Sequence, residues 1–217
     1  MLDALRREVL DAAMGLVKYS LVSLAGGNAS GRDRNTGHVV ITPSGMAYDT
    51  LKPEDLVVVD MSGRVVEGRW RPSVDTQMHL RAYALNPMFS GVIHTHSPCA
   101  TALAVMNRPL PVITTTMANV LGVEVPVSEL AVAGTDGAAD LVEGIAENPA
   151  ILLRSHGVLA FGPTVTRALA VAVTVEEAAR IYFKAASLGT PPVLPPDVVR
   201  EAKQFYDTQY GQKGAAK

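Results

Sequence analysis

The stretch of sequence that decides the fold is GVIHTHS at residues 91–97, together with SHG at residues 155–157 far downstream. Both lie in apolar runs that predict buried strands. Side chains alternate along a strand with a period of two, so His94 and His96 should point to the same face. With His156 supplied by the second strand, they are the usual start of a metal site, because catalytic zinc takes three protein ligands and leaves one position open. The alternative is that the three histidines are ordinary core or surface residues without a ligand role.

The chain has 217 residues, of which 48% are hydrophobic, and a formal net charge of -2. This size suits a single domain over residues 1–217, and residues 214–217 are expected to form a disordered tail. The charge balance argues against nucleic-acid binding. No apolar run approaches the ~18 residues of a membrane span, the charged N-terminus lacks the apolar core of an export signal, and the single Cys99 suits a reducing compartment. We therefore expect a cytoplasmic protein that binds neither nucleic acid nor membrane.

Hydrophobic periodicity and turn residues predict an alternation of helices and short strands. Helices are predicted over residues 2–22, 75–85, 100–106, 135–145 and 166–186, with a last helix that ends near residue 210. Strands are predicted around His94 and over residues 38–42, 112–116 and 151–156, with a hairpin at 56–67, whereas residues 24–31 are assigned to a turn. Because hairpins occur among the alternating elements, we expect a mixed sheet covered by helices rather than a purely parallel one.

A carboxylate that could complete the metal site is Asp75, which begins the predicted helix just before the histidine strand. A carboxylate beside a metal can act both as ligand and as general base. The competing interpretation is a plain helix-start acid, which the helix dipole favours on its own. His79 follows Asp75 by one helical turn and is either its partner or a structural histidine.

Two loops carry small residues and hydrogen-bond donors, at residues 26–30 (GGNAS) and 42–45 (TPSG). Glycines let backbone N–H groups approach a ligand closely, and hydroxyl and amide side chains add further donors, which together can hold a phosphate. Neither loop matches a nucleotide-binding motif, and each could be an ordinary turn. Their occurrence beside a histidine set favours a phosphorylated substrate.

Five motifs follow one another along the chain, GNAS at 27–30, TPSG at 42–45, PSVD at 72–75, HTH at 94–96 and SHG at 155–157. In this set the chain resembles the class II aldolase/adducin-like family, the superfamily of L-fuculose-1-phosphate aldolase and L-ribulose-5-phosphate 4-epimerase, over nearly its whole length. The resemblance implies a three-layer α/β/α fold around a mixed, largely antiparallel sheet. It also implies a cyclic homotetramer with active sites at the subunit interfaces.

The resemblance further assigns roles to individual residues. It implies that His94, His96 and His156 bind Zn²⁺, although Mn²⁺ and Co²⁺ also suit imidazole ligands. It implies that Asp75 is a catalytic residue and a metal ligand. Tyr210 resembles the tail tyrosine of the family, which implies a catalytic role for it as well. The residues implied to hold the substrate phosphate are Gly27, Asn28, Ser44, Gly45 and Ser73.

Four positions bear on the choice of reaction. Aldolases of the fuculose type carry Glu where this chain has Asp75, whereas the epimerases carry Asp. A serine expected before this acid is Val74, which removes one phosphate donor. The epimerases use Asp at the position of Asn119, and an amide cannot exchange a proton as a carboxylic acid does. The tyrosine that fuculose-type aldolases place in the same segment is replaced by Thr115.

On this basis we expect a Zn²⁺-dependent class II aldolase that reversibly cleaves a ketose 1-phosphate to dihydroxyacetone phosphate and an aldehyde. Asp75 would move the proton at the carbon next to the carbonyl. Tyr210 of a neighbouring subunit would protonate or deprotonate the aldehyde oxygen. Val74 and the apolar residues 117–120 favour a less hydroxylated aldehyde end, as in 5-deoxyribulose or methylthioribulose 1-phosphate. The alternatives are a 4-epimerase of a pentulose 5-phosphate, a decarboxylase of a phosphorylated sugar acid, and a non-catalytic adducin-like assembly module, against which the three histidines argue.

Overall fold

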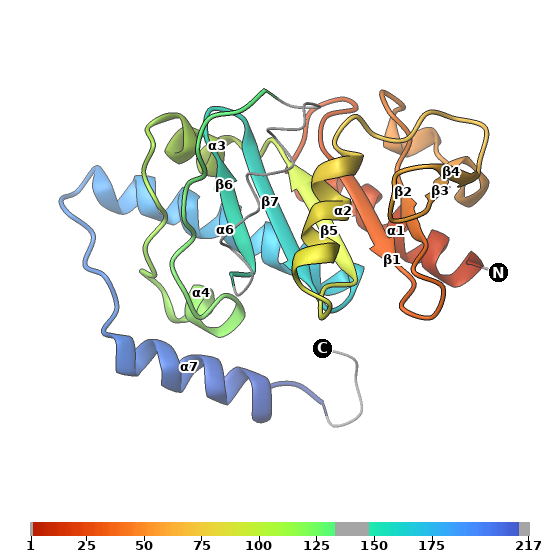
Figure 1. Ribbon diagram of the computed structural model, residues 1–217. Helices are drawn as coiled ribbons and strands as arrows, with labels where there is room; N and C mark the ends of the chain where they lie inside the picture. Colours follow the sequence, from red (N-terminus) through yellow and green to blue (C-terminus); the bar gives the residue numbers. More distant parts are fainter. Residues whose placement is uncertain (1, 133–147, 213–217) are drawn as a thin grey trace.

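A computed structural model describes residues 2–132 and 148–212 of the chain (Figure 1). The helix predicted over residues 135–145 and the tail predicted at 214–217 lie outside the described residues. Of the helices in the described part, none has both the length and the apolar composition that a membrane span requires.

Seven strands form one sheet in the order β4-β3-β2-β1-β5-β7-β6 (Figure 1). All six ladders between neighbouring strands are antiparallel, and a parallel bridge joins Val127 to Leu152 outside them. The α/β fold with a largely antiparallel sheet is therefore confirmed. The strands are β1 (Asn28–Arg32), β2 (Val39–Ile41), β3 (Val57–Val59), β4 (Val65–Glu67), β5 (Gly91–Thr95), β6 (Ala150–Leu153) and β7 (Gly157–Gly162).

Helices cover both faces of this sheet and give the three layers expected (Figure 1). They are α1 (Asp3–Lys18), α2 (Thr76–Leu85), α3 (Pro98–Val105), α4 (Thr115–Val120), α6 (Val165–Ala186) and α7 (Pro196–Thr208). On one face, Ile93 and its cross-strand partner Ala160 lie in a core shared with α1, α3 and α6. On the other face, Val92 and its partner Phe161 lie in a second core with α2. Because neighbouring residues of β5 and β7 alternate between two cores, residues 91–93 of β5 and residues 157–162 of β7 carry no polar side chain.

The strand β1 was not predicted, because Asn28, Ser30 and Gly31 have low β-propensity and resemble a turn. It nevertheless lies in the middle of the sheet, with Asn28 opposite His94 of β5. A Cβ atom at Gly31 would come within 2.6 Å of the Leu5 side chain in α1 and 2.7 Å of the Val165 side chain in α6, so both side chains would have to move. The close approach of two helices explains a glycine in a strand interior.

The strand predicted over residues 112–116 is also wrong, since α4 begins there instead. Thr114 caps this helix, and its hydroxyl accepts a hydrogen bond from the Met117 backbone N–H at 3.1 Å. The run of β-branched residues at 112–116 favours a strand, but a threonine at the N-cap position satisfies an otherwise unpaired N–H donor of the helix. The helix α7 packs against α4. The other helices and the β3–β4 hairpin occur where they were predicted, within a few residues.

Candidate metal centre and active site

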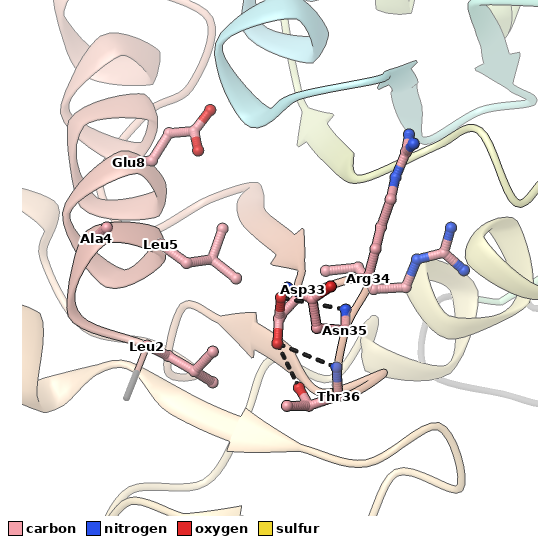
Figure 2. A pocket seen from close by; sticks show the side chains of 9 residues that line it. Leu2, Ala4, Leu5, Glu8, Asp33, Arg34, Asn35 and Thr36 are labelled. Atoms are coloured by element: carbon pink, nitrogen blue, oxygen red, sulfur yellow. Dashed lines mark hydrogen bonds between the residues drawn. The ribbon is translucent and has the colours of Figure 1, made fainter.

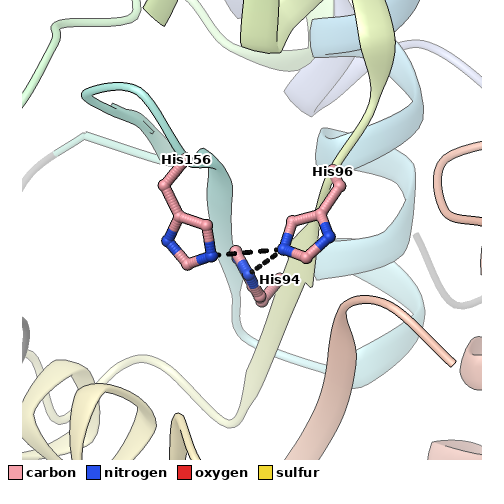
Figure 3. A group of neighbouring side chains, drawn as sticks. All are labelled: His94, His96 and His156. Atoms are coloured by element: carbon pink, nitrogen blue, oxygen red, sulfur yellow. Dashed lines mark hydrogen bonds between the residues drawn. The ribbon is translucent and has the colours of Figure 1, made fainter. Parts of the chain in front are cut away.

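Three histidine side chains converge at the end of β5 (Figure 3). The Nε2 atoms of His94 and His96 are 3.0 Å apart, and those of His96 and His156 are 3.2 Å apart. His94 is fully buried in the strand, whereas His96 lies just beyond its end and is exposed. His156 lies in the turn between β6 and β7, so the strand predicted over residues 151–156 ends earlier, at Leu153. The convergence that the sequence predicted is present, with one ring on a strand and two in adjoining turns.

The backbone around the β6–β7 turn lets the rings approach. Ser155 adopts a left-handed conformation with φ of 57°, which turns the chain sharply just before His156. Gly157 then leaves room for the neighbouring rings, because a Cβ atom would collide with the Thr95 carbonyl oxygen. The same atom would lie 3.1 Å from His96 and 3.3 Å from His94. The absence of a side chain at Gly157 therefore lets the histidine rings come together.

The environment keeps His94 neutral and fixes its tautomer. The pKa of His94 is lowered to about 3, chiefly by burial and also by the neighbouring His156 and His96, although Asp75 opposes the shift. The Val158 carbonyl lies 2.9 Å from Nδ1, so Nδ1–H donates to it and the Nε2 lone pair faces the other histidines. Burial, and then His156, also lower the pKa of His96.

This donor set fits a divalent metal ion. Nitrogen atoms that bind one tetrahedral ion at roughly 2.0–2.1 Å lie about 3.3–3.4 Å apart, close to the 3.0 and 3.2 Å between the Nε2 atoms. Lone pairs that face each other at these distances repel unless a proton or cation lies between them. His94, His96 and His156 are thus consistent with the divalent metal typical of such sites, and imidazole suits Zn²⁺, Mn²⁺ and Co²⁺.

Asp75 lies beside the histidines rather than capping its own helix. It occupies the N-cap position of α2, but its side chain makes no cap hydrogen bond. Its Oδ2 atom accepts a hydrogen bond from Asn28 Nδ2 at 2.8 Å and lies 3.9 Å from His94 Nε2. Its Oδ1 atom and Asn28 Oδ1 are buried without a hydrogen-bond partner among the described residues. Unpaired buried oxygens are costly, so this arrangement suits a ligand with donors to offer.

His79 lies in the core and is not part of the histidine cluster. Its Nδ1 atom is 2.7 Å from Ser30 Oγ, which in turn is 2.7 Å from Tyr83 Oη. All three side chains are buried. Burial lowers the pKa of His79 to about 4, although Asp75 opposes the shift. The sequence singled out His79, but it placed Ser30 in a donor-rich loop and gave no signal for its contact with His79.

The segments predicted to hold phosphate lie next to one another and adjoin the histidines. Residues 42–44 run antiparallel to residues 71–73 through a bridge between Pro43 and Pro72. Gly27 packs against the His94 carbonyl, where a Cβ atom would not fit. Tyr48, which sequence reasoning missed, ties the first loop in place by donating to the carbonyls of Gly26 and Gly27. The phosphate-binding roles of these residues stay predictions.

Tyr210 lies apart from the histidine cluster in the single chain. It follows α7, is 54% exposed, and stacks on Tyr206 with ring centroids 4.9 Å apart. It has no contact with the three histidines in the part of the chain that the structure describes. A catalytic role would therefore require a second subunit.

A cavity of about 540 Å³ lies between the start of α1 and the β1–β2 connection (Figure 2). Leu2 and Leu5 line it on one side, and the turn of residues 33–36 lines it on the other. The Asp33 carboxylate accepts hydrogen bonds there from the hydroxyl and the backbone N–H of Thr36. None of the lining residues belongs to the candidate site, so the cavity does not bear on its chemistry.

The chain belongs to the Class II Aldolase and Adducin N-terminal domain family, whose model matches residues 7–183. The resemblance noted from the motifs is thereby confirmed, and the chain is an enzyme of the class II aldolase/epimerase superfamily. The non-catalytic assembly module is accordingly not favoured.

Several relatives cover nearly the whole chain. It is 39% identical to L-ribulose-5-phosphate 4-epimerase UlaF of Salmonella paratyphi B over 229 residues, which cover 98% of this chain and 100% of the relative. A solved structure of L-fuculose 1-phosphate aldolase superimposes with a TM-score of 0.87 at 35% identity, covering 94% of this chain and 96% of that one. YgbL of Escherichia coli, a putative aldolase/epimerase/decarboxylase, superimposes with a TM-score of 0.82 at 26% identity, covering 93% and 98%.

Proposed function

We propose that this chain is a metal-dependent 4-epimerase of a pentulose 5-phosphate. The observation that carries the proposal is the full-length identity of 39% to L-ribulose-5-phosphate 4-epimerases. The aspartate at position 75 agrees with it, since the epimerase branch carries Asp there. The earlier expectation of aldol cleavage of a ketose 1-phosphate is less well supported.

The reaction can proceed by reversible cleavage of a carbon–carbon bond. The C4 hydroxyl loses its proton, the C3–C4 bond breaks, and its electron pair remains on the three-carbon fragment that carries the carbonyl. The two-carbon aldehyde keeps the phosphate, turns its other face, and adds back, after which its oxygen regains a proton. No atom is gained or lost, and a proton donor or acceptor is needed on each face of the aldehyde.

The residues around the histidines can supply these functions. His94, His96 and His156 would hold the metal, which when bound stabilises negative charge that develops at the ketose carbonyl oxygen. Asp75 would exchange the proton on one face through its unpartnered Oδ1 atom. Gly27, Asn28, Ser44, Gly45 and Ser73 would hold the phosphate, and so keep the aldehyde fragment bound while it turns.

The proton on the other face needs a second group, and Asn119 cannot provide it. With its amide nitrogen turned toward two carbonyls, Asn119 donates to Thr115 at 3.3 Å and to Ala202 of α7 at 2.9 Å. We propose that Tyr210 of a neighbouring subunit takes this role in a homotetramer. Sedimentation at assay concentration tests the assembly, and a fully active monomer would exclude a role for Tyr210 in trans.

The second candidate is the aldolase of a ketose 1-phosphate. Asn119 favours it, because aldol cleavage does not need an acid and a base on both faces of the aldehyde. The similarity to L-fuculose 1-phosphate aldolase agrees with it as well.

The test is to incubate zinc-loaded protein with L-ribulose 5-phosphate and, separately, with a panel of ketose 1-phosphates. Carbon-13 NMR should show the C4 epimer of the pentulose phosphate accumulating to equilibrium. Release of dihydroxyacetone phosphate from the panel, without epimerisation of the pentulose, would establish the aldolase and overturn the proposal.

A further inference from the structure

The proposed phosphate site contains only uncharged donors. Its members are backbone N–H groups of two glycines, the amide of Asn28 and the hydroxyls of Ser44 and Ser73. A phosphate ester carries between one and two negative charges near neutral pH, and a cationic donor adds a Coulombic attraction to it that neutral donors lack. An arginine would match its oxygens with a planar fork. Residues 69–71, just before Ser73 in the sequence, contain two arginines.

The backbone register puts Arg71 on the same face as two of the proposed phosphate ligands. The Ser44 N–H donates to the Arg71 carbonyl at 3.0 Å, and the Ser73 N–H donates to the Thr42 carbonyl at 3.1 Å. These bonds flank the Pro43–Pro72 bridge, so Ser44 lies opposite Arg71. Residues directly opposite each other in an antiparallel pair share a face, and so do residues two apart in one strand. Arg71 therefore shares a face with Ser44 across the pair and with Ser73 along its own segment.

Arg71 is also uncommitted in the described residues, unlike Arg64 and Arg69. Arg64 pairs with Asp60 at 3.1 Å, and Arg69 pairs with Asp55 at 2.8 Å and lies over the Trp70 ring. The exposed Arg71 side chain has no hydrogen-bond or ion-pair partner within residues 2–132 and 148–212.

The segment before Arg71 is held in place independently of any ligand. The Trp70 indole N–H donates to Asp55 Oδ1 at 2.9 Å, and Asp55 Oδ2 accepts from the Lys52 backbone N–H at 3.1 Å. The free guanidinium thus projects from a fixed backbone, which lowers the entropy cost of binding. On the other side, Gly45 leaves open space, since a Cβ atom there would meet nothing within 4 Å.

We infer that Arg71 binds the substrate phosphate and makes the enzyme selective for phosphorylated sugars. The inference rests on the proposed function, because it takes the surface beside Ser44 and Ser73 to be the phosphate site. Arg71 contributes to binding in the ground state and the transition state equally, since the phosphate is remote from the bond that breaks.

The test compares Arg71→Ala and Arg71→Lys with the control Arg64→Ala, which removes an arginine of the β3–β4 turn that already has a partner. In the zinc-loaded enzyme, Arg71→Ala should raise KM for the pentulose phosphate about 10-fold and leave kcat within about twofold. Arg71→Lys should recover part of the loss, and Arg64→Ala should behave as wild type. Equal KM values for Arg71→Ala and Arg64→Ala would overturn the inference.

A binding measurement separates this inference from the proposed function. Titration with inorganic phosphate, followed by phosphorus-31 NMR, should give a dissociation constant about 10-fold higher for Arg71→Ala than for Arg64→Ala. If no pentulose phosphate is epimerised but this difference remains, the proposed function fails and the role of Arg71 holds. If wild type epimerises the substrate but the two variants bind phosphate equally, the role of Arg71 fails and the proposed function holds.

Discussion

Lowering the pH from 7 to 5 should destabilise the metal-free protein through His79. This histidine is fully buried, and its pKa is lowered from 6.5 in the unfolded chain to about 4 in the folded protein, chiefly by burial. Between these values the unfolded chain binds a proton that the folded protein does not, so the free energy of unfolding falls as the pH falls. The loss begins below the unfolded pKa and is complete below the folded one.

The size of the effect follows from the two pKa values. At pH 5 the unfolded state gains about 2 kcal/mol from protonation of this one group, relative to pH 7, and the limit for a shift of roughly 2.5 pKa units is about 3 kcal/mol. The variant His79→Asn removes the titrating group, while its amide takes the place of Nδ1 opposite Ser30. The buried His94 also makes the folded protein less stable in acid, for the same reason. Only the difference between wild type and the variant therefore reports on His79.

The assay is urea unfolding in the presence of a chelator, at pH 7 and pH 5 and at a fixed chain concentration. The variant should lose about 2 kcal/mol less than wild type between the two pH values. His38→Asn, in the β1–β2 connection, is the matched control for removal of a histidine. The reasoning is refuted if His79→Asn and wild type lose the same stability on acidification.

Three further outcomes are expected. His94→Ala should weaken zinc binding at least about 100-fold, since even outer contacts of a metal site are worth 10–100-fold; bound zinc measured after dialysis at wild-type level would exclude His94 as a ligand. Gly157→Ala should cost about 1–3 kcal/mol of stability by overpacking, because its methyl group collides with the Thr95 carbonyl; an unchanged urea midpoint would contradict this. Asn119→Asp should loosen α7, because a carboxylate cannot donate to the Ala202 carbonyl; amide exchange in α7 as slow as in wild type would argue against that contact.

The histidine cluster could be predicted because its signal is local. Alternation along a strand places His94 and His96 on the same face. His156 could be added to them because it lies in one of the few other segments that predict a buried strand. The position of Asp75 was predictable in the same way, from the start of a helix close to that strand. What the sequence did not reveal is that the carboxylate leaves its own helix uncapped and bonds to Asn28 instead.

The failures have two physical causes: contacts between distant elements override local propensity at β1, and a local side-chain cap overrides it at α4. Asn28 to Arg32 form a central strand because β2 and β5 pair with them on both sides, and Gly31 is there because helices crowd it. At α4, one side-chain cap at Thr114 outweighs a β-branched run. The position of Tyr210 relative to the histidines was beyond prediction for another reason, since it depends on an assembly of chains.

The histidine cluster joins parts of the chain that are far apart, since His96 and His156 are separated by 60 positions. A divalent ion held by this cluster would cross-link the two segments, and its binding would offset part of the chain entropy lost when the long loop between them closes. Free metal would therefore stabilise the folded chain, because such an ion binds the folded state and not the unfolded one. Under metal starvation, chains without an ion would be the first to unfold and be degraded.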